Sequence, residues 1–215
     1  MTGVSESSQQ SSNLKDEGYN FVEVFKDIIM ASVILYGDKL HIRNNYLGNG
    51  GYLDTNGYAT AQGAKYNVYT ATSPTRGPGT GTWQILSTAG KGIGTEVYSG
   101  DTVFLVNLYQ NNGGYLGTNG HAPSPELYNI YTADKTARPV ETLTWYIFSD
   151  TTSGYDGKVR EGDITRFLNG YNNVHGGFLD TCFTAGIPGE VYKVYTSLLS
   201  NRGNGTGTWN LSKAI

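Results

Sequence analysis

Three side chains in the first third of the chain carry the chemistry that a sugar-binding pocket needs: Asp54, Asn67 and Tyr69. A carboxylate accepts charge-assisted hydrogen bonds from adjacent hydroxyls, and an amide both donates and accepts them. A tyrosine ring offers an apolar face to the C–H face of a sugar ring, with a hydroxyl at its edge. If Leu53 and Val68 face a core, strand alternation puts the three side chains on the outer surface, where we expect them to converge on one pocket.

Similar residues recur at corresponding positions later in the chain, but the copies are not identical. Gly117 replaces the aspartate in the second copy, and Lys193 replaces the amide in the third. A binding residue can be lost from one copy without harm to the fold, so this pattern is typical of a degenerate site beside intact ones. The remaining candidates are Asn129 and Tyr131 in the second copy and Asp180 and Tyr195 in the third.

Arginines form a competing set of candidates. Arg76 and Arg202 lie in similar loops, "PTRGPGTGTW" and "SNRGNGTGTW", whereas Arg138 lies in "TARPVETLTW". A guanidinium binds carboxylates or sugar hydroxyls bidentately. The alternative is a structural arginine that bonds backbone carbonyls or pairs with the aspartate that opens each repeat. The second copy departs both at Gly117 and around Arg138, which favours two like sites and one altered site.

All these candidates belong to a threefold internal repeat of about 62 residues, which we place at 33–95, 96–158 and 159–215. Each copy reads as four short strands separated by Gly, Asn and Pro turns, and helical periodicity is absent from residue 33 onward. Three such copies predict an all-β fold that closes with pseudo-threefold symmetry. The repeat includes the three tryptophans of the chain, in equivalent positions: Trp83, Trp145 and Trp209.

Most repeated residues are expected to serve the fold rather than a site. We expect the tryptophans to pack against the core, the Asn44 series to bond turn backbone, and the paired glycines to allow positive φ or close backbone approach. The residues expected to point inward are Leu53, Leu116, Leu179, Val68, Ile130 and Val194.

The repeat number, strand order and site positions together resemble the β-trefoil, and within it the ricin-B-like carbohydrate-binding modules. The resemblance implies a galactose-type sugar held by Asp54 on a second strand and by Asn67 and Tyr69 on a third. The Gln-x-Trp signature of that family is missing, since Gly81, Leu143 and Gly207 stand two residues before the tryptophans. Long loops also leave open a different lectin family with its site elsewhere.

Composition excludes several classes of protein. A net charge of −3 with only 15% charged residues is unlike a nucleic-acid binder. The single cysteine, Cys182, allows no internal disulfide, and the polar N-terminus lacks a secretory pattern, so we expect a cytoplasmic protein or one released without a signal peptide. The histidines do not cluster and no carboxylate pair is placed for glycoside hydrolysis, so we expect no metal, no cofactor and no catalysis.

Residues 1–32 lie outside the repeat as an N-terminal extension. Residues 1–18 have a composition typical of disorder, and apolar residues from 20 to 32 follow helical spacing. We expect a short helix that caps the fold, with a dimerisation or membrane-contact helix as the alternative. Charges interrupt the stretch, so no membrane span is expected.

The sequence thus predicts a non-enzymatic lectin that binds glycans or glycoproteins through two or three equivalent sites, with homo-oligomerisation through the N-terminal segment as a further possibility. A protein-binding β-trefoil, such as a protease inhibitor, and a toxin-associated membrane-active lectin remain the alternatives.

Overall fold

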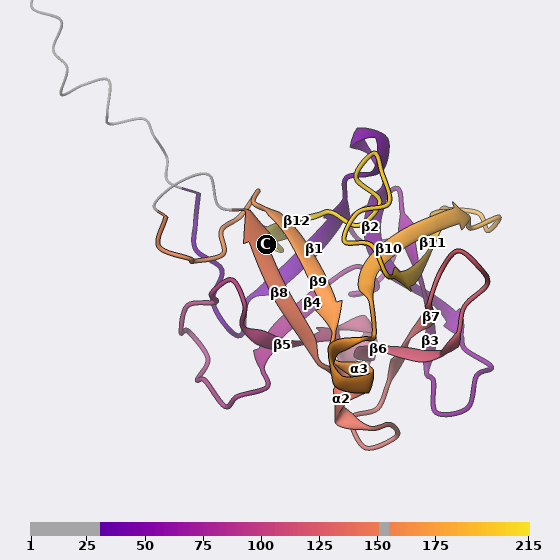
Figure 1. Cartoon of the computed structure of the whole chain (residues 1–215), viewed down its shortest axis with the longest axis horizontal. Coiled ribbons are helices and arrows are strands. Elements are labelled where there is room, and N and C mark those ends of the chain that lie inside the picture. The colour runs from indigo at the N-terminus through magenta and orange to yellow at the C-terminus, as the bar shows by residue number, and fades with distance from the viewer. Residues whose placement is uncertain (1–30, 151–154) are drawn as a thin grey trace, which may run out of the picture. The chain divides into compact units, whose positions relative to one another are not determined.

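The computed structural model describes residues 31–150 and 155–215. The expected N-terminal helix, with its capping, oligomer or membrane role, lies outside the described residues. Within them, twelve strands form one antiparallel sheet, whose outermost strands pair onward so that the sheet closes as a barrel (Figure 1).

The strands follow the repeats, four to each. They are β1 (Lys39–Asn44), β2 (Gly51–Tyr58), β3 (Tyr66–Ala71), β4 (Trp83–Ser87), β5 (Thr102–Asn107), β6 (Gly114–His121), β7 (Tyr128–Ala133), β8 (Trp145–Asp150), β9 (Ile164–Asn169), β10 (Phe178–Thr184), β11 (Glu190–Ser197) and β12 (Trp209–Lys213). Four single turns of helix lie between strands in the described ranges, too short to leave a periodic signal in the sequence: η1 (Tyr46–Gly48), η2 (Tyr109–Asn111), α2 (Val140–Leu143) and α3 (Tyr171–Val174).

The expected β-trefoil of three repeated modules is wrong as a fold class, because the twelve strands form one closed antiparallel barrel. The last strand of each repeat pairs with the first strand of the next, as β4 with β5, β8 with β9 and β12 with β1. The third strands, β3, β7 and β11, also pair with one another. The fold is therefore all-β, as expected, but it is a single closed antiparallel barrel in which every repeat depends on its neighbours.

The core is the apolar interior of this barrel. The six residues expected to point inward are each at most 3% exposed, and the three tryptophans are fully buried. Each indole Nε1 donates to the carbonyl of a core leucine 29 or 30 residues earlier, at 2.8 to 3.0 Å. The core role predicted for these residues is confirmed, and the hydrogen bond explains how three tryptophans are buried without an orphaned donor.

A buried asparagine begins each turn between the first and second strands. In the second repeat, Asn107 Nδ2 donates to the Thr80 carbonyl at 2.7 Å, while its Oδ1 accepts from the Tyr109 amide at 3.0 Å and from Thr55 Oγ1 at 3.2 Å. A Cβ at Gly113 would lie 2.1 Å from that Oδ1, so only glycine fits there. Asn44 and Asn169 make the same bonds, so the asparagine series fixes the turn that carries a tyrosine toward the preceding repeat.

Candidate functional site

The aspartate on which the predicted pocket depended does not reach the surface. Asp54 is fully buried, and its Oδ1 accepts a hydrogen bond from Arg76 Nη2 at 2.7 Å. The same nitrogen donates to the Thr55 carbonyl at 3.1 Å and lies 2.7 Å from Glu190 Oε1. The prediction that Asp54 faces outward beside Asn67 is therefore wrong, because the loop that carries Arg76 folds over the strand and covers its outer face.

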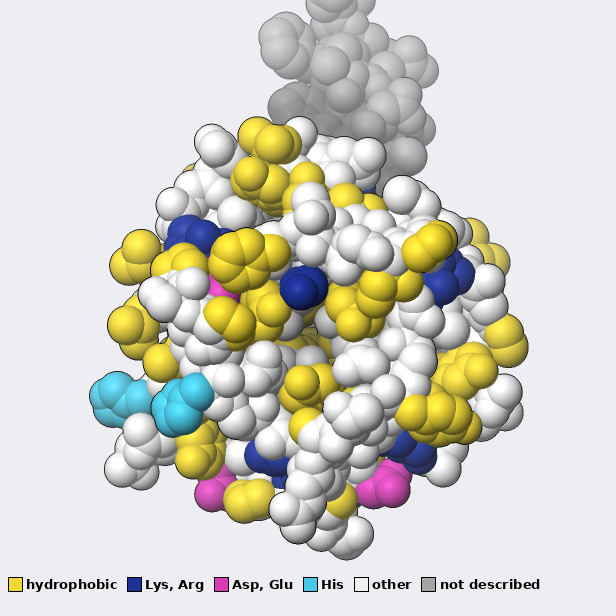
Figure 2. Space-filling view, turned by 90° about the vertical axis from the view of Figure 1, so that its right-hand side faces the viewer, with side chains coloured by type: hydrophobic (Ala, Val, Ile, Leu, Met, Phe, Trp, Pro, Cys, Tyr) yellow, Lys and Arg dark blue, Asp and Glu magenta, His cyan; other side chains and the backbone are white. Residues whose placement is uncertain are grey.

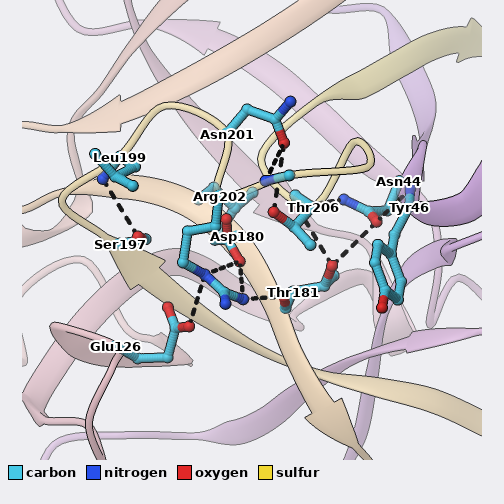
Figure 3. Close-up of polar contacts among 12 residues, drawn as sticks. Asn44, Tyr46, Glu126, Asp180, Thr181, Ser197, Leu199, Asn201, Arg202 and Thr206 are labelled. Atoms are coloured by element: carbon cyan, nitrogen blue, oxygen red, sulfur yellow. Dashed lines mark hydrogen bonds and ion pairs between the residues drawn. The ribbon is translucent and has the colours of Figure 1, made fainter.

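Asp180 is buried in the same way in the third repeat (Figure 3). Arg202 Nη2 donates to Asp180 Oδ1 at 2.8 Å and to the Thr181 carbonyl at 2.7 Å, while Arg202 Nε lies 2.9 Å from Glu126 Oε1. Each of the two clusters thus holds two carboxylates on one guanidinium. Neither arginine pairs with the aspartate that opens its repeat, so that form of the structural alternative is wrong as well.

The two clusters bury more negative than positive charge. Asp54 Oδ2, Asp180 Oδ2 and both oxygens of Glu190 and of Glu126 have no aligned hydrogen-bond donor among the described residues. Burial raises the pKa of the Glu190 carboxyl to about 7, and Arg76 offsets that shift only in part. Burial also raises the pKa of the other three carboxyls. The fold keeps these carboxyls buried, although burial disfavours their charged form.

The second repeat replaces this cluster with an apolar contact. A Cβ at Gly117 would lie 2.6 Å from Leu143 Cδ2, so Leu143 occupies the space that an aspartate fills elsewhere. The equivalents of Leu143 are Gly81 and Gly207, and a Cβ at Gly81 would lie 3.1 Å from Asp54 Oδ2. In the first and third repeats an aspartate on the second strand is accompanied by a glycine two residues before the tryptophan. In the second repeat the strand carries the glycine, and a leucine stands two residues before the tryptophan.

Three equivalent clefts open between neighbouring repeats, and we call them cleft 1, cleft 2 and cleft 3. Their volumes are about 290, 220 and 260 Å³. Each combines the end of a β-hairpin, the loop arginine of the same repeat and a tyrosine from the helical turn of the next. The lining includes Tyr58, Tyr66, Arg76 and Tyr109 in cleft 1, His121, Tyr128, Arg138 and Tyr171 in cleft 2, and Thr184, Tyr192, Arg202 and Tyr46 in cleft 3.

Aromatic rings form the walls of the clefts. In cleft 1, Tyr58 stacks on Tyr66 with ring centroids 5.2 Å apart, and Tyr66 meets Tyr109 edge to face at 5.4 Å. Cleft 2 repeats this arrangement with His121 in the place of Tyr58, and cleft 3 keeps only the edge-to-face pair. Tyr58 is 79% exposed, so cleft 1 presents a ring face to solvent.

The remaining predicted residues gather in a single pocket where β3, β7 and β11 meet. Asn67 lies opposite Tyr131, Asn129 opposite Tyr195, and Lys193 opposite Tyr69 in the strand registers. This axial pocket has a volume of about 190 Å³. Figure 2 shows that end of the barrel, where basic side chains come to the surface among hydrophobic and uncharged ones. Five predicted site residues, Asn67, Tyr69, Asn129, Tyr131 and Tyr195, thus share one pocket instead of belonging to three.

Arg76 and Arg202 are predicted site residues that do line clefts, with side chains 25% and 23% exposed. Sequence reasoning missed the cleft tyrosines, although their repetition was visible. The signal that the sequence offers is the regular recurrence of two tyrosine series, but only the barrel shows which members meet across the boundary between repeats: Tyr66 with Tyr109, Tyr128 with Tyr171 and Tyr192 with Tyr46.

Other kinds of site find no support in the part of the chain that the structure describes. No group of three or more His, Cys, Asp or Glu side chains there is arranged to hold a metal ion. No helix among residues 31–150 and 155–215 is long and apolar enough to cross a membrane.

No protein-family model and no curated protein matches the chain. Solved structures do share its fold. A Caenorhabditis elegans protein of unknown function has a TM-score of 0.67 and 16% identity, and the match covers 85% of this chain and 97% of that one. The SDF2-like protein from Arabidopsis thaliana has a TM-score of 0.63 and 17% identity, with 84% and 95% covered.

A third similar structure is the S. cerevisiae protein O-mannosyltransferase Pmt1–Pmt2 complex bound to the sugar donor. Its TM-score is 0.64 at 14% identity, and the match covers 87% of this chain but only 26% of that chain. The expected kinship with ricin-B-like modules is wrong, because similar structures include an SDF2-like protein and a mannosyltransferase complex and because Asp54 is buried. Identities this low show the fold alone.

Proposed function

We propose that this chain is a carbohydrate-binding protein that holds single sugar residues in the clefts between its repeats and catalyses no reaction. The observation that carries the proposal is the recurrence of one cleft three times, each with an edge-to-face tyrosine pair and an arginine. Aromatic faces and a few fixed polar groups are the combination that suits the C–H face and hydroxyls of a pyranose.

The size of the clefts supports a small ligand. Pockets for drug-sized molecules measure roughly 300 to 1,000 Å³. The clefts lie at or below the lower end of that range, which suits one sugar residue at the end or side of a glycan. Such a shallow site typically binds in the millimolar range, or about −4 kcal/mol. Several clefts on one rigid barrel would raise the avidity for a surface that displays many glycans.

The comparisons support a sugar-related role only in outline. One similar structure is of a mannosyltransferase complex bound to its sugar donor, and that ligand belongs to that complex. We propose that this chain also binds sugars, but that it catalyses no reaction on them. Glycoside hydrolysis needs two carboxyl groups placed across the bond to be broken. Here Asp54 and Glu190 share one arginine at the base of cleft 1, which fits binding better than turnover.

A glycan array tests the proposal directly. The wild-type protein should retain glycans, and Tyr58→Ala should weaken retention by at least several-fold because it removes the exposed ring face of cleft 1. Tyr155→Ala is the matched control, since Tyr155 is 92% exposed and lines none of the clefts. Equal loss in both variants, or no retained glycan with wild type together with no NMR shift at tens of millimolar monosaccharide, would overturn the proposal.

A further inference from the structure

Arg138 is the loop arginine of cleft 2, and it lacks the carboxylates that its two counterparts hold. Gly117 stands in the place of Asp54 and Asp180, as described above. The second carboxylate is missing too. Glu190 and Glu126 each precede a hairpin tyrosine by two residues, and the residue at that position before Tyr66 is Ala64.

The hairpins show that Ala64 is the structural equivalent of those glutamates. A Cβ at Gly189, one residue before Glu190, would lie 3.4 Å from Arg76 Cδ. A Cβ at Gly63, one residue before Ala64, would lie 3.6 Å from Arg138 Cγ. Arg138 thus packs against the hairpin of the first repeat as Arg76 packs against that of the third, but Ala64 stands at the position from which Glu190 supplies a carboxylate to Arg76.

The guanidinium of Arg138 is left with little to bind inside the protein. Its Nε is buried and has no hydrogen-bond acceptor among the described residues, and its Nη1 makes one long contact of 3.5 Å with the Gln62 carbonyl. No ion pair to Arg138 occurs within the described ranges, 31–150 and 155–215. A guanidinium with open donors at the back of a cleft is a ready partner for a planar anion.

We propose that cleft 2 binds a carboxylate-bearing sugar, with Arg138 forming a bidentate pair to the carboxylate and the rings of His121 and Tyr128 contacting the sugar. This inference rests on the proposed function and adds its ligand class. In clefts 1 and 3 the guanidinium is already paired with two buried carboxylates, so these clefts disfavour an anion and suit neutral sugars. The altered repeat is therefore a site of different specificity on the same barrel.

The test compares D-glucuronate with D-glucose on the full chain by NMR titration. Glucuronate should shift the amide signals of the Arg138 loop and of the 119–121 turn at concentrations at least tenfold below those that glucose needs. Arg138→Gln should abolish this preference. Ala64→Glu, which supplies the missing carboxylate while Arg138 stays in place, should abolish it as well. Arg166→Gln, which removes an arginine that lines none of the clefts, should leave it unchanged.

Each outcome decides between the two proposals. If neutral glycans bind in clefts 1 and 3 but glucuronate shows no preference for cleft 2, the present inference is overturned and the proposed function stands. If glucuronate binds through Arg138 while no neutral glycan binds, the inference stands and the wider proposal fails. If methyl sulfate and acetate displace glucuronate at equal concentrations, Arg138 is a general anion site and the assignment to a sugar is wrong.

Discussion

Glu190 is a buried carboxyl that shares one cation, Arg76, with Asp54, and its burial changes its pKa. Its side chain is fully covered and its pKa lies near 7, whereas Asp54 takes the better-aligned hydrogen bond to Arg76. The folded protein therefore holds a proton on Glu190 over a range of pH in which an unfolded chain would release it.

This proton makes stability fall as pH rises. Between about pH 4.5 and 7 the folded state binds more protons than the unfolded state, so the free energy of unfolding should decrease across that window, by at most about 3 kcal/mol from Glu190. The raised pKa values of Asp54, Asp180 and Glu126 act in the same direction. Urea unfolding at pH 5 and pH 8 measures the difference, and Glu190→Gln should reduce it. A variant with the same pH dependence as wild type would contradict the assignment.

The exchange of aspartate for leucine in the second repeat makes a second prediction at the scale of single residues. Gly117→Asp should destabilise the barrel because its Cβ meets Leu143 at 2.6 Å, and overpacking typically costs about 1 to 3 kcal/mol. Leu143→Gly should destabilise it through a cavity. The double variant should be more stable than the sum of the two by about 1 to 3 kcal/mol, because the new aspartate then reaches Arg138. Chemical unfolding of all four proteins gives the coupling, and additive effects would refute it.

At the scale of elements, β2 shows why the site was only half predictable. Strand alternation identifies Leu53 as a core residue, and the structure agrees. The rule fails at the next position because Leu53, Asp54 and Thr55 are all buried in succession. A loop from the same repeat covers the outer face of the strand there. The residues of β2 give no sign of that loop, so its effect on burial could not be predicted from them. The strands themselves were predictable because their turns and periodicity are local properties.

The clefts were missed for a related reason. Their two walls come from different repeats, so that Tyr66 belongs to one copy and Tyr109 to the next. Comparison of the copies shows that both tyrosines recur, but it does not show which tyrosine faces which. That information lies in the pairing of β4 with β5, which is set by packing across the whole barrel.

The turn that begins at Asn107 should link stability to binding. Asn107→Ala removes two acceptor contacts and one donor contact, including the one that holds the Tyr109 amide. We expect a loss of about 2 to 3 kcal/mol of unfolding free energy. We also expect weaker glycan binding in cleft 1, which thermal unfolding and NMR titration would measure together. Asn44→Ala is the matched control: it should cost similar stability but weaken cleft 3. Loss of binding at both clefts in either variant would mean that the barrel as a whole had loosened.

At the scale of the whole molecule, the number of ligands distinguishes the clefts from the axial pocket. There is one junction of β3, β7 and β11 per chain, so the axial pocket can hold a single sugar. Clefts 1 and 3 should together hold two neutral sugars per chain. Native mass spectrometry with increasing monosaccharide measures this ratio. A ratio of one that Tyr131→Ala abolishes would place binding in the axial pocket and show that the clefts are not the site.

The join between β12 and β1 is of the same kind as the joins between β4 and β5 and between β8 and β9. Ala214 N donates to the Lys39 carbonyl at 2.8 Å, so the strand that opens the barrel and the strand that ends it run side by side. Three equivalent strand pairs thus join neighbouring repeats, and the pair of β12 and β1 is the one whose strands are not consecutive in the chain. Consider a circular permutant that starts at β5, ends at β4 and joins Ile215 to Val33 by a short linker. It would keep every strand pair and all three clefts, because pairing between neighbouring strands holds the barrel together whatever the order of the strands along the chain.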